Sequence, residues 1–462
     1  MIEWYKKLPQ VFYSEVNSVP FRDSEIFLWN EDLGKQFAIS ACDFKQVHAG
    51  LAMAYAGHQF GHFNMLGDGR AMLLSEMKDK NKVLFDLHLK GSGPTPYSRR
   101  GDGLASRSAM VREFIVSECM HALGIQTSRS LFVIDTHETI VRQNIEQGGV
   151  LVRLSKSLIR VGTFEFARVA SSAAEFKIFA DATIERLYPE LCSQENPYLE
   201  LLRRVRDEQI ALVVQWMRVG FIHGVMNTDN MSIAGETIDY GPCAFLNAYD
   251  ENKVYSSIDR DGRYAFGRQP AITQWNLWAF AHSLLPLIHE KEQVALEMAR
   301  EVIAEFPDIF AQAYYTMMCS KLGMIYKGEV KKKAFVEETL TFLQEYELDY
   351  TGFFRSLTHN GKFQYEPHIA KVFEQWKTDW NGMRIENQCT IEHSNATMLA
   401  SNPNAIPRNA WVEKMLHPSL SSEEIQEALK SFQHALNSYE FALEFEKEYR
   451  TDRAEYQTFC GT

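Results

Sequence analysis

Within VLFDLHLK, residues 83–90, apolar and polar residues alternate strictly from residue 85 to residue 90. Phe or Leu occupies each odd position from residue 85 on, and polar residues, among them His88 and Lys90, occupy the even positions. Because successive side chains of a strand point to opposite faces, this pattern predicts a strand with one apolar and one polar face. The strand ends at Lys90 and continues into a Gly-rich loop at residues 91–94. A shorter apolar run at residues 71–76 predicts another strand.

Longer apolar segments predict helices. Residues 106–123 begin with polar residues and stop before Gly124, a favourable residue just beyond a helix end. Residues 207–219 and 275–288 are apolar almost all round, which predicts buried helices. Amphipathic helical periods occupy residues 290–345 and 421–450.

The remaining segments complete a two-part plan. Residues 138–169 are predicted to form three strands, ETIVRQ, GGVLVRLS and SLIRVGTFEFARV, and residues 394–407 an ordered loop rich in Asn, Pro and Ser. The order of elements predicts an α+β protein with a bilobal, protein-kinase-like fold. Its strand-rich N-lobe spans residues 1–168, and its mostly helical C-lobe, with a C-terminal helical extension, spans residues 169–462.

A polar loop, FIHGVMNTDNMSIAGETIDYGP, follows the buried helix at residues 207–219. Asn230 and Asp239 lie nine residues apart, across a predicted hairpin with its turn at residues 234–236. Mg²⁺ takes oxygen ligands and usually rests on one or two carboxylates plus phosphate oxygens. The kinase catalytic loop has the same outline, with an Asn and a later Asp as metal ligands. We therefore expect Asn230 and Asp239 to hold a divalent cation.

The same loop lacks the usual kinase base. That position, two residues after His223, is Val225, which cannot accept a proton. The nearest replacement carboxylate is Asp229. Taken alone, the loop could equally be a connection whose polar residues only form turns. Residues upstream decide between this interpretation and a divalent-cation site.

Upstream, a strand lysine precedes a helix glutamate. Glu113 lies in the mainly apolar helix at residues 106–123, where an unpaired buried carboxylate would be costly. Lys90 is its natural partner, and such a pair clamps phosphates in kinases. A solvated Lys90 and an exposed Glu113 remain the alternative for each residue taken alone.

Several glycines and arginines add candidate nucleotide contacts. Glycines allow positive φ and close approach of the backbone to a ligand, although an ordinary hairpin turn also explains the segment at residues 67–70. Arginine matches phosphate oxygens bidentately. The candidates are Gly67, Gly69, Arg70, Asp102, Gly103, Arg153 and Arg160.

Composition narrows the class of protein. The 462 residues allow two domains or lobes, and 45% hydrophobic with 23% charged residues is ordinary for a globular chain. The net charge of −12 argues against non-specific nucleic-acid binding, so clustered basic residues would serve a local anion. No signal core and no run of about 18 apolar residues is present, so we expect a cytoplasmic protein with no membrane or nucleic-acid partner.

The ordered motifs resemble those of the selenoprotein O family. The match covers roughly residues 50–290 and weakens to PRN at residues 407–409. The motifs are GDGR at residues 67–70, KGSG at 90–93, TPYSR at 95–99, GDG at 101–103, VREF at 111–114, HGVMNTDN at 223–230, DYGP at 239–242, GRYAFG at 262–267 and QPA at 269–271.

The resemblance implies a pseudokinase fold that binds ATP in a flipped orientation and transfers AMP to Ser, Thr or Tyr hydroxyls of proteins. Pyrophosphate leaves, Mg²⁺ or Mn²⁺ assists, and UTP is a possible second donor. Asp229 would be the proton acceptor, and Asn230 and Asp239 the metal ligands. Lys90, Arg153 and Arg160 would hold phosphates, with Glu113 pairing Lys90, while Gly67, Gly69, Arg70, Asp102 and Gly103 would line the nucleotide pocket.

One departure concerns cysteines. The seven cysteines, at positions 42, 119, 192, 243, 319, 389 and 460, form no CxxC pair, which disfavours a zinc site or a disulfide framework. Family members often carry a C-terminal Cys or selenocysteine, here Cys460. The loop cysteine that could pair with it falls near Tyr255, and Cys243 lies just after the DYGP turn. The sequence therefore argues against a redox switch.

Two other functions stay open at this point. The chain could be a true phosphotransferase with Asp229 as base, which would release ADP, or a nucleotide-binding scaffold without turnover.

Overall fold

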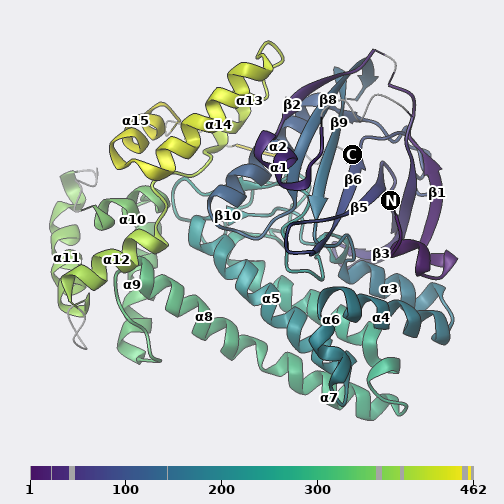
Figure 1. Ribbon diagram of the computed structural model, residues 1–462. Helices are drawn as coiled ribbons and strands as arrows, with labels where there is room; N and C mark the ends of the chain where they lie inside the picture. Colours follow the sequence, from purple (N-terminus) through teal and green to yellow (C-terminus); the bar gives the residue numbers. More distant parts are fainter. Residues whose placement is uncertain are drawn as a thin grey trace.

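The computed structural model describes residues 2–21, 23–40, 47–142, 144–359, 367–384, 390–449 and 456–458. Strands dominate the N-terminal part and helices the rest (Figure 1), so the prediction of an α+β protein is confirmed. The strands are β1 (Tyr13–Asn17), β2 (Glu25–Trp29), β3 (Ala49–Gln59), β4 (His62–Gly67), β5 (Ala71–Lys78), β6 (Leu84–Lys90), β7 (Ala105–Ser106), β8 (Arg129–Val141), β9 (Ile145–Ser155), β10 (Phe221–Ile222) and β11 (Ala244–Phe245).

The helices begin within the strand-rich part and then make up almost all of the C-terminal part. They are α1 (Glu31–Phe37), α2 (Arg107–Ala122), α3 (Val161–Ala170), α4 (Ala173–Leu187), α5 (Pro197–Val219), α6 (Gln269–Ile288), α7 (Glu292–Ala304), α8 (Phe306–Lys321), α9 (Val330–Glu345), α10 (Tyr350–Thr358), α11 (Ala370–Arg384), α12 (Ile391–Ser401), α13 (Asn409–Met415), α14 (Ser422–Asn437) and α15 (Tyr439–Tyr449).

The large sheet places β6 at its centre. Its order is β1-β3-β5-β6-β9-β8-β2, with antiparallel neighbours, and β4 and β7 pair beside this path with β3 and β9. In the β6–β9 register, His88 lies opposite Arg153 and Lys90 opposite Leu151. A central strand therefore carries its terminal lysine into the middle of the molecule.

The two faces of β6 follow the predicted alternation. Leu87 and Leu89 pack in an apolar cluster with Phe37 of α1. On the opposite face, His88 and Lys90 are buried rather than solvated. Because a buried charge needs a partner, this face requires compensating groups, and α2 and the loop after β10 supply them.

One strand prediction is wrong. Residues 157–169 do not form a third strand, because the chain leaves the sheet after Ser155 and enters α3 at Val161. Phe164 and Phe166 alternate with the polar residues at 163 and 165, which is typical of a strand. Helix α3 nevertheless buries both sets, because Glu165 finds partners in Thr228 and His58. Gly162 lets α3 approach β3 closely, since an added Cβ would lie 2.0 Å from the carbonyl oxygen of Ala56.

The loop predicted at residues 394–407 is also partly wrong, because α12 covers its first half. Thr390 caps this helix by accepting a hydrogen bond from the backbone N–H of His393 at 3.1 Å. Arg384 donates to the side chains of Ser394 and Asn395 at 3.0 and 2.7 Å. These contacts with α11 outweigh the low helix propensity of the Asn- and Ser-rich sequence.

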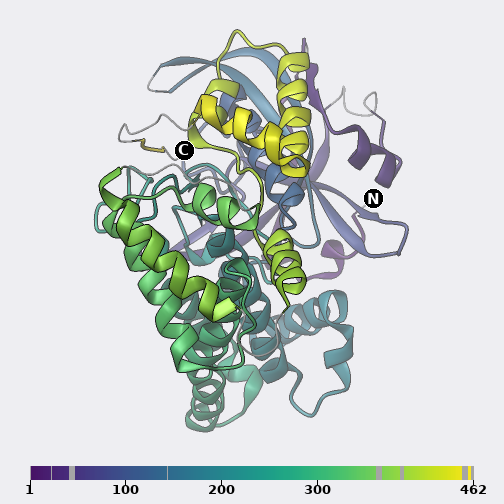
Figure 2. The same ribbon diagram turned by 90° about the vertical axis from the view of Figure 1, so that its left-hand side faces the viewer.

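The last helices return to the strand-rich part. Figure 2 shows α13–α15 beside the sheet, above the other C-terminal helices, and α14 contacts both α2 and β2. Arg408, which is fully buried, anchors this return. Its guanidinium contacts both carboxylate oxygens of Asp349 at 2.8 and 2.9 Å and Glu446 on α15 at 2.9 Å. The ion pairs join α10, the start of α13 and α15.

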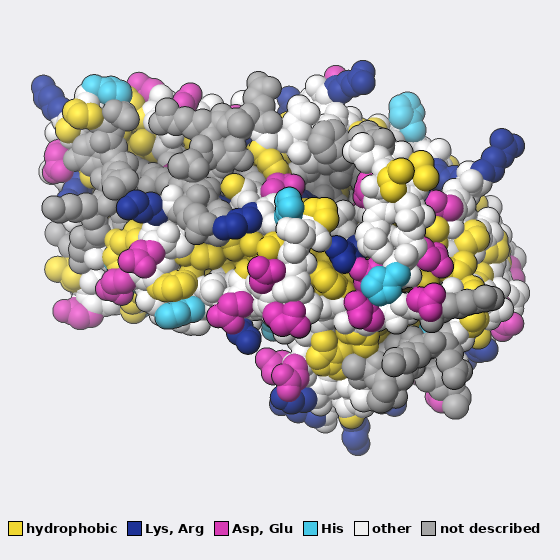
Figure 3. All heavy atoms as spheres, turned by 90° about the horizontal axis from the view of Figure 1, so that it is seen from above, with side chains coloured by type: hydrophobic (Ala, Val, Ile, Leu, Met, Phe, Trp, Pro, Cys, Tyr) yellow, Lys and Arg dark blue, Asp and Glu magenta, His cyan; other side chains and the backbone are white. Residues whose placement is uncertain are grey.

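The surface and the helices give two further observations. Within the described part of the chain, no helix combines the length and apolarity needed to cross a membrane. On the face drawn in Figure 3, the Lys and Arg side chains of the described residues stand among Asp and Glu rather than in one broad basic area.

Replacing Arg408 should destabilise the whole fold. Arg408→Ala removes the cation that contacts both carboxylate oxygens of buried Asp349 and leaves Glu446 with Arg355 alone. Removal of one partner from a buried ion pair costs about 3–5 kcal/mol. Urea denaturation measures this loss. Arg300→Ala on the exposed side of α7 is the control and should change the free energy of unfolding by less than about 0.5 kcal/mol. Equal stability of the two variants would contradict this account of Arg408.

Candidate active site

A cavity of about 510 Å³ lies between the sheet and the loop after β10. Strands β3 to β6 and β9 supply one side, and residues 229–239 supply the other. The predicted residues that line it are Gly67, Gly69, Arg70, Lys90, Asp102, Gly103, Arg153, Arg160, Asp229, Asn230 and Asp239. Glu113 does not line the cavity and lies behind Lys90 instead.

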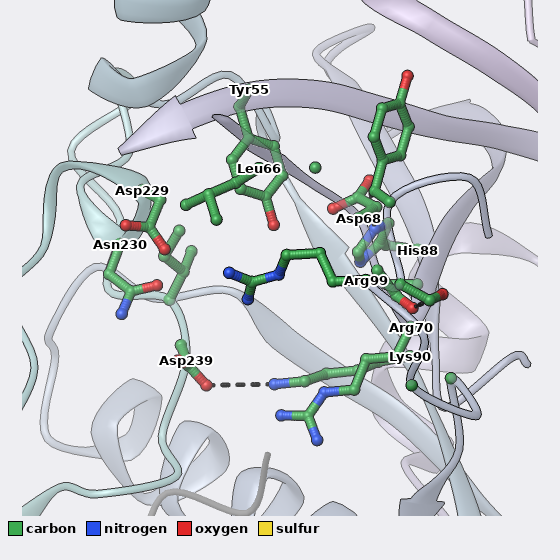
Figure 4. Close-up of a pocket in the computed structure, with 18 of the residues that line it drawn as sticks. Tyr55, Leu66, Asp68, Arg70, His88, Lys90, Arg99, Asp229, Asn230 and Asp239 are labelled. Atoms are coloured by element: carbon green, nitrogen blue, oxygen red, sulfur yellow. Dashed lines mark hydrogen bonds and ion pairs between the residues drawn. The ribbon is translucent and has the colours of Figure 1, made fainter. Parts of the chain in front are cut away.

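Lys90 connects the three parts of the site. Its ammonium contacts the Glu113 carboxylate on α2 and donates to Asp239 Oδ1 at 3.2 Å (Figure 4). Glu113 Oε2 also lies 3.6 Å from Arg153 Nη1. The side chains of Lys90 and Glu113 are 8% and 5% exposed, so the predicted pair forms away from bulk water. The carboxylates fix the ammonium at the cavity wall.

Asp239 combines an unusual backbone with a stabilised negative charge. Its φ of 65° lies in the left-handed region, which non-glycine residues rarely adopt. Burial alone would raise the pKa of its carboxyl, but Lys90 and Arg70 outweigh burial and hold this pKa below its ordinary value. Asp239 therefore remains an anion at the cavity wall.

Asn230 presents its carboxamide to the same space. It ends a short 3₁₀ helix, Thr228–Asn230, and its Nδ2 donates to the carbonyl oxygen of Val225 at 3.1 Å. That bond turns its oxygen toward the cavity, as Figure 4 shows. Asn230 and Asp239 thus provide neutral and anionic oxygens, a set suited to Mg²⁺ or Mn²⁺ that also has phosphate ligands.

Asp229 differs from Asp239 in having no stabilising contact at one oxygen. Its Oδ1 is buried and lacks a hydrogen-bond partner among the described residues. Gly57 makes room for it, because a Cβ there would lie 2.4 Å from Oδ1. Burial raises the pKa of Asp229 to about 6, against the opposing effect of Arg160. A carboxylate held in this way is suited to accept a proton.

Glu165 on α3 positions the loop that carries Asp229. Its carboxylate accepts a hydrogen bond from the hydroxyl of Thr228 and contacts the ring of His58. The backbone N–H of His58 in turn donates to the Thr228 hydroxyl at 2.7 Å. Strand β3 and helix α3 therefore fix the residue that precedes Asp229.

Further residues line the cavity that the sequence motifs did not predict as site residues. Asp68, buried between Gly67 and Gly69, accepts from the backbone N–H of Met53 at 3.1 Å and lies 3.6 Å from Arg160 Nη2. Tyr55 lies beneath the Arg160 guanidinium, 4.2 Å from its carbon to the ring centre. The position of Asp68 within GDGR was a usable signal, whereas nothing in the sequence pointed to Tyr55.

His88 also lines the cavity and was not predicted as a site residue. Burial lowers its pKa to about 4, so its ring is neutral, and its Nδ1 accepts from Arg153 Nε at 3.3 Å. The polar face of the predicted strand already contained His88. Its neutrality leaves the arginine charge available to an anion.

Asp102 lies at the rim and already has a cationic partner. Both of its carboxylate oxygens accept from Arg142, at 2.8 and 2.9 Å, at the end of β8. Arg142 lines the cavity, although its sequence context gave no signal. Arg70 and Arg99 extend toward Asp229, Asn230 and Asp239 (Figure 4). The basic side chains of the cavity are Arg70, Lys90, Arg99, Arg142, Arg153 and Arg160.

The loop geometry corrects one prediction. A turn forms at Ser232–Gly235, where the N–H of Gly235 donates to the carbonyl of Ser232 at 3.3 Å. Among the described residues, the two segments that flank this turn do not pair with each other as a hairpin. Instead, Ser232 forms an isolated β-bridge with Arg160, and Thr237 forms one with Thr127. These bridges satisfy buried backbone groups, which would be costly to leave unpaired.

The cysteines lie apart from this chemistry. Cys460 is outside the described residues. Cys243 is buried, and burial raises the pKa of its thiol to about 12, which keeps it protonated.

Comparison with known sequences agrees with this geometry. The sequence model of a family described as Protein adenylyltransferase SelO matches residues 3–439. Proteins named Protein nucleotidyltransferase YdiU are similar along almost their whole length. The one from Bacillus cereus strain B4264 is 42% identical over 477 residues, covering 99% of this chain and 97% of the relative.

The relative from Brevibacillus brevis is 43% identical over 476 residues, with 99% and 96% covered, and the one from Clostridium beijerinckii is 41% identical with the same coverage. These matches identify the protein as a nucleotidyltransferase. This chain belongs to the SelO family.

The Lys90–Glu113 pair gives a direct test of the site. Lys90→Ala should weaken ATP binding and abolish transfer, and Glu113→Ala should lose activity because Lys90 loses its anchor. If the two act as a unit, the double variant will be no worse than either single one. Calorimetry with ATP and assays of transfer measure both effects.

The matched control is Glu118→Ala. Glu118 also lies on α2 but pairs with Arg129, at 2.9 and 2.7 Å, outside the cavity. Its loss should reduce stability and leave ATP affinity unchanged. Strictly additive losses for Lys90 and Glu113 would show that they act separately.

Proposed function

We propose that this protein transfers AMP from ATP to Ser, Thr or Tyr hydroxyls of other proteins and releases pyrophosphate. The observation that carries the proposal is the contrast between Asp229 and Asp239. Asp239 is paired with Lys90, whereas Asp229, which lines the same cavity, has one oxygen that is buried against Gly57 without a hydrogen-bond partner among the described residues. Asp239 is therefore suited to remain charged, and Asp229 is suited to accept a proton.

The basic lining of the cavity supports ATP as the donor. Arg153 and Arg160 are buried residues that line the same cavity as Lys90, although the chain as a whole carries a net charge of −12. Cations in a partly desolvated cavity bind polyphosphate more strongly than they would on the surface. The family's description as an adenylyltransferase agrees with adenosine triphosphate as the donor.

A kinase-like organisation supports the same function. Lys90 on a central strand, Glu113 on the following helix and an Asn–Asp metal pair on a loop reproduce the arrangement of kinase phosphate sites. We propose that residues 1–168 form the nucleotide-binding lobe and residues 169–462 the helical lobe.

The missing base at position 225 distinguishes adenylyl transfer from phosphoryl transfer. Val225 is 5% exposed and offers only its carbonyl, which is bonded to Asn230. An acceptor hydroxyl would attack the α-phosphorus and form a new P–O bond. The bond from that phosphorus to the bridging oxygen breaks, pyrophosphate leaves, and the hydroxyl proton passes to Asp229.

A divalent cation, Mg²⁺ or Mn²⁺, would rest on Asn230 and Asp239. The pair fits such an ion because both oxygens reach the cavity and one is anionic. The cation would neutralise charge on the phosphates. Lys90, Arg153 and Arg160 orient the triphosphate, and Asp229 serves the acceptor. A general base of this kind contributes about 10²–10⁴-fold to the rate.

Two variants should separate base from ligand. Asp239→Ala should abolish metal-dependent ATP binding, and extra metal should recover little, because charge and geometry are both lost. Asp229→Ala should keep ATP binding and lower kcat about 10²-fold or more, since a base acts in the transition state. Calorimetry and pyrophosphate release measure the two effects. If Asp229→Ala lost metal-dependent ATP binding while Asp239→Ala kept it, the roles of base and metal ligand would have to be exchanged between the two residues.

The products of ATP provide the general test. Incubation with protein acceptors should release pyrophosphate and raise the acceptor mass by one AMP group, as intact-protein mass spectrometry will show. Release of ADP would instead identify a phosphotransferase. ATP binding without any turnover would identify a nucleotide-binding scaffold.

A further inference from the structure

A second cavity, also of about 510 Å³, lies beside the catalytic loop and is here named the acceptor groove. Phe60, Ile258, Arg260, Arg263, Arg268 and Ile272 are among its lining residues. None of these residues lines the nucleotide cavity. The groove therefore offers a separate binding surface within reach of the same loop.

The hairpin between β3 and β4 separates the two cavities. Gln59 lines the nucleotide cavity, and the next residue, Phe60, lines the groove. The backbone N–H of Phe60 donates to Asn227 Oδ1 at 3.2 Å, and the hydroxyl of Tyr264 donates to the same oxygen at 2.6 Å. Asn227 lies two residues before Asp229, so the wall of the groove is bonded to the loop that carries the proposed base.

The groove is rigid at its base. The carboxylate of Asp259 accepts from the backbone N–H groups of Arg263 and Tyr264, both at 2.8 Å. Backbone bonds from Thr458 to Tyr255 and from Ser257 to Thr458, at 2.8 and 2.9 Å, hold the segment just before it. A preformed surface loses little conformational entropy on binding.

Its charge is positive. Arg260, Arg263 and Arg268 line the groove, and none of them lies within ion-pair distance of a carboxylate among the described residues. Arg268 donates only to the carbonyls of Asp261 and Gly262, at 3.1 and 3.2 Å. The buried carboxylate of Asp259 is already used by the backbone, which leaves Asp261 as the exposed acidic residue of the lining.

Apolar and aromatic groups accompany these cations. Ile258 is 46% exposed within the groove. The guanidinium of Arg263 lies 5.0 Å from the ring centre of Trp275, and that ring contacts His58 at 5.1 Å. Such a wall suits an apolar side chain next to an acidic one.

We propose that this groove binds the protein acceptor as a peptide segment with acidic and apolar residues around the hydroxyl to be modified. The proposal rests on the adenylyl transfer proposed above and adds the chemistry of its acceptor. The basic lining would select acidic residues, and Ile258 and Phe60 would contact an apolar one. The acceptor hydroxyl would extend past the turn at Phe60 into the neighbouring cavity that Asp229 lines.

Synthetic peptides with one Tyr provide the test. One carries Glu and Leu around the Tyr, and a second of equal length carries Lys and Leu. The wild-type protein should modify the acidic peptide with a kcat/KM about tenfold higher. Arg260→Glu/Arg268→Glu should lower kcat/KM for the acidic peptide about tenfold, through KM, and should favour the basic peptide. ATP affinity by calorimetry should stay at the wild-type value, which shows that the variant is folded.

The control is Arg300→Glu/Lys377→Glu, which makes the same change of charge on exposed positions of α7 and α11. It should keep the wild-type preference. Equal use of both peptides by the wild type, or an unchanged preference in the groove variant, would overturn the acceptor groove while AMP transfer itself stands. If the wild type releases no pyrophosphate with any acceptor, the proposed function fails, and the groove proposal fails with it.

Discussion

The site depends on one buried ammonium held between two carboxylates. Lys90 contacts Glu113 on α2 and Asp239 on the loop after β10, so a strand, a helix and a loop from distant parts of the sequence meet at one charge. Removing Lys90 would leave two carboxylates without their shared cation in a poorly hydrated place. This mutual requirement explains why the end of β6 and the left-handed backbone of Asp239 face one another.

The same electrostatic logic divides the acidic residues of the cavity. Asp239 and Asp68 lie near cations, and the pKa of each is lowered, although burial opposes the shift. Burial dominates at Asp229, whose pKa is raised. Environments that push the pKa values of neighbouring carboxyls apart are typical of sites in which one group holds charge and another moves a proton.

Sequence reasoning succeeded where a pattern reflects one physical cause. Alternation located β6 because one face meets α1 and the other meets charged partners, and the need of a buried Glu113 for a cation located the Lys90 pair. It failed at α3, because apolar and polar residues alternate there as in a strand, although the polar Glu165 is buried with partners from other segments. The Tyr55 and Arg142 contacts depend on how distant strands cross the cavity, which no local pattern contains.

The acceptor groove could not be predicted from the sequence, because it too depends on contacts that no local pattern contains. Only Arg263 of its arginines was part of a matched motif, and the absence of carboxylate partners among the described residues becomes visible only when Asp259 turns its oxygens to the backbone. Asn227 joins the wall of the groove to the loop of Asp229.

The central claim is that an acceptor hydroxyl attacks the α-phosphorus of ATP. Parallel incubations of the protein and its acceptors with ATP labelled at the α-phosphate or at the γ-phosphate test it most directly. The account predicts protein-bound label from the α position alone, with γ-label recovered in pyrophosphate. Protein-bound label from the γ position alone would contradict it.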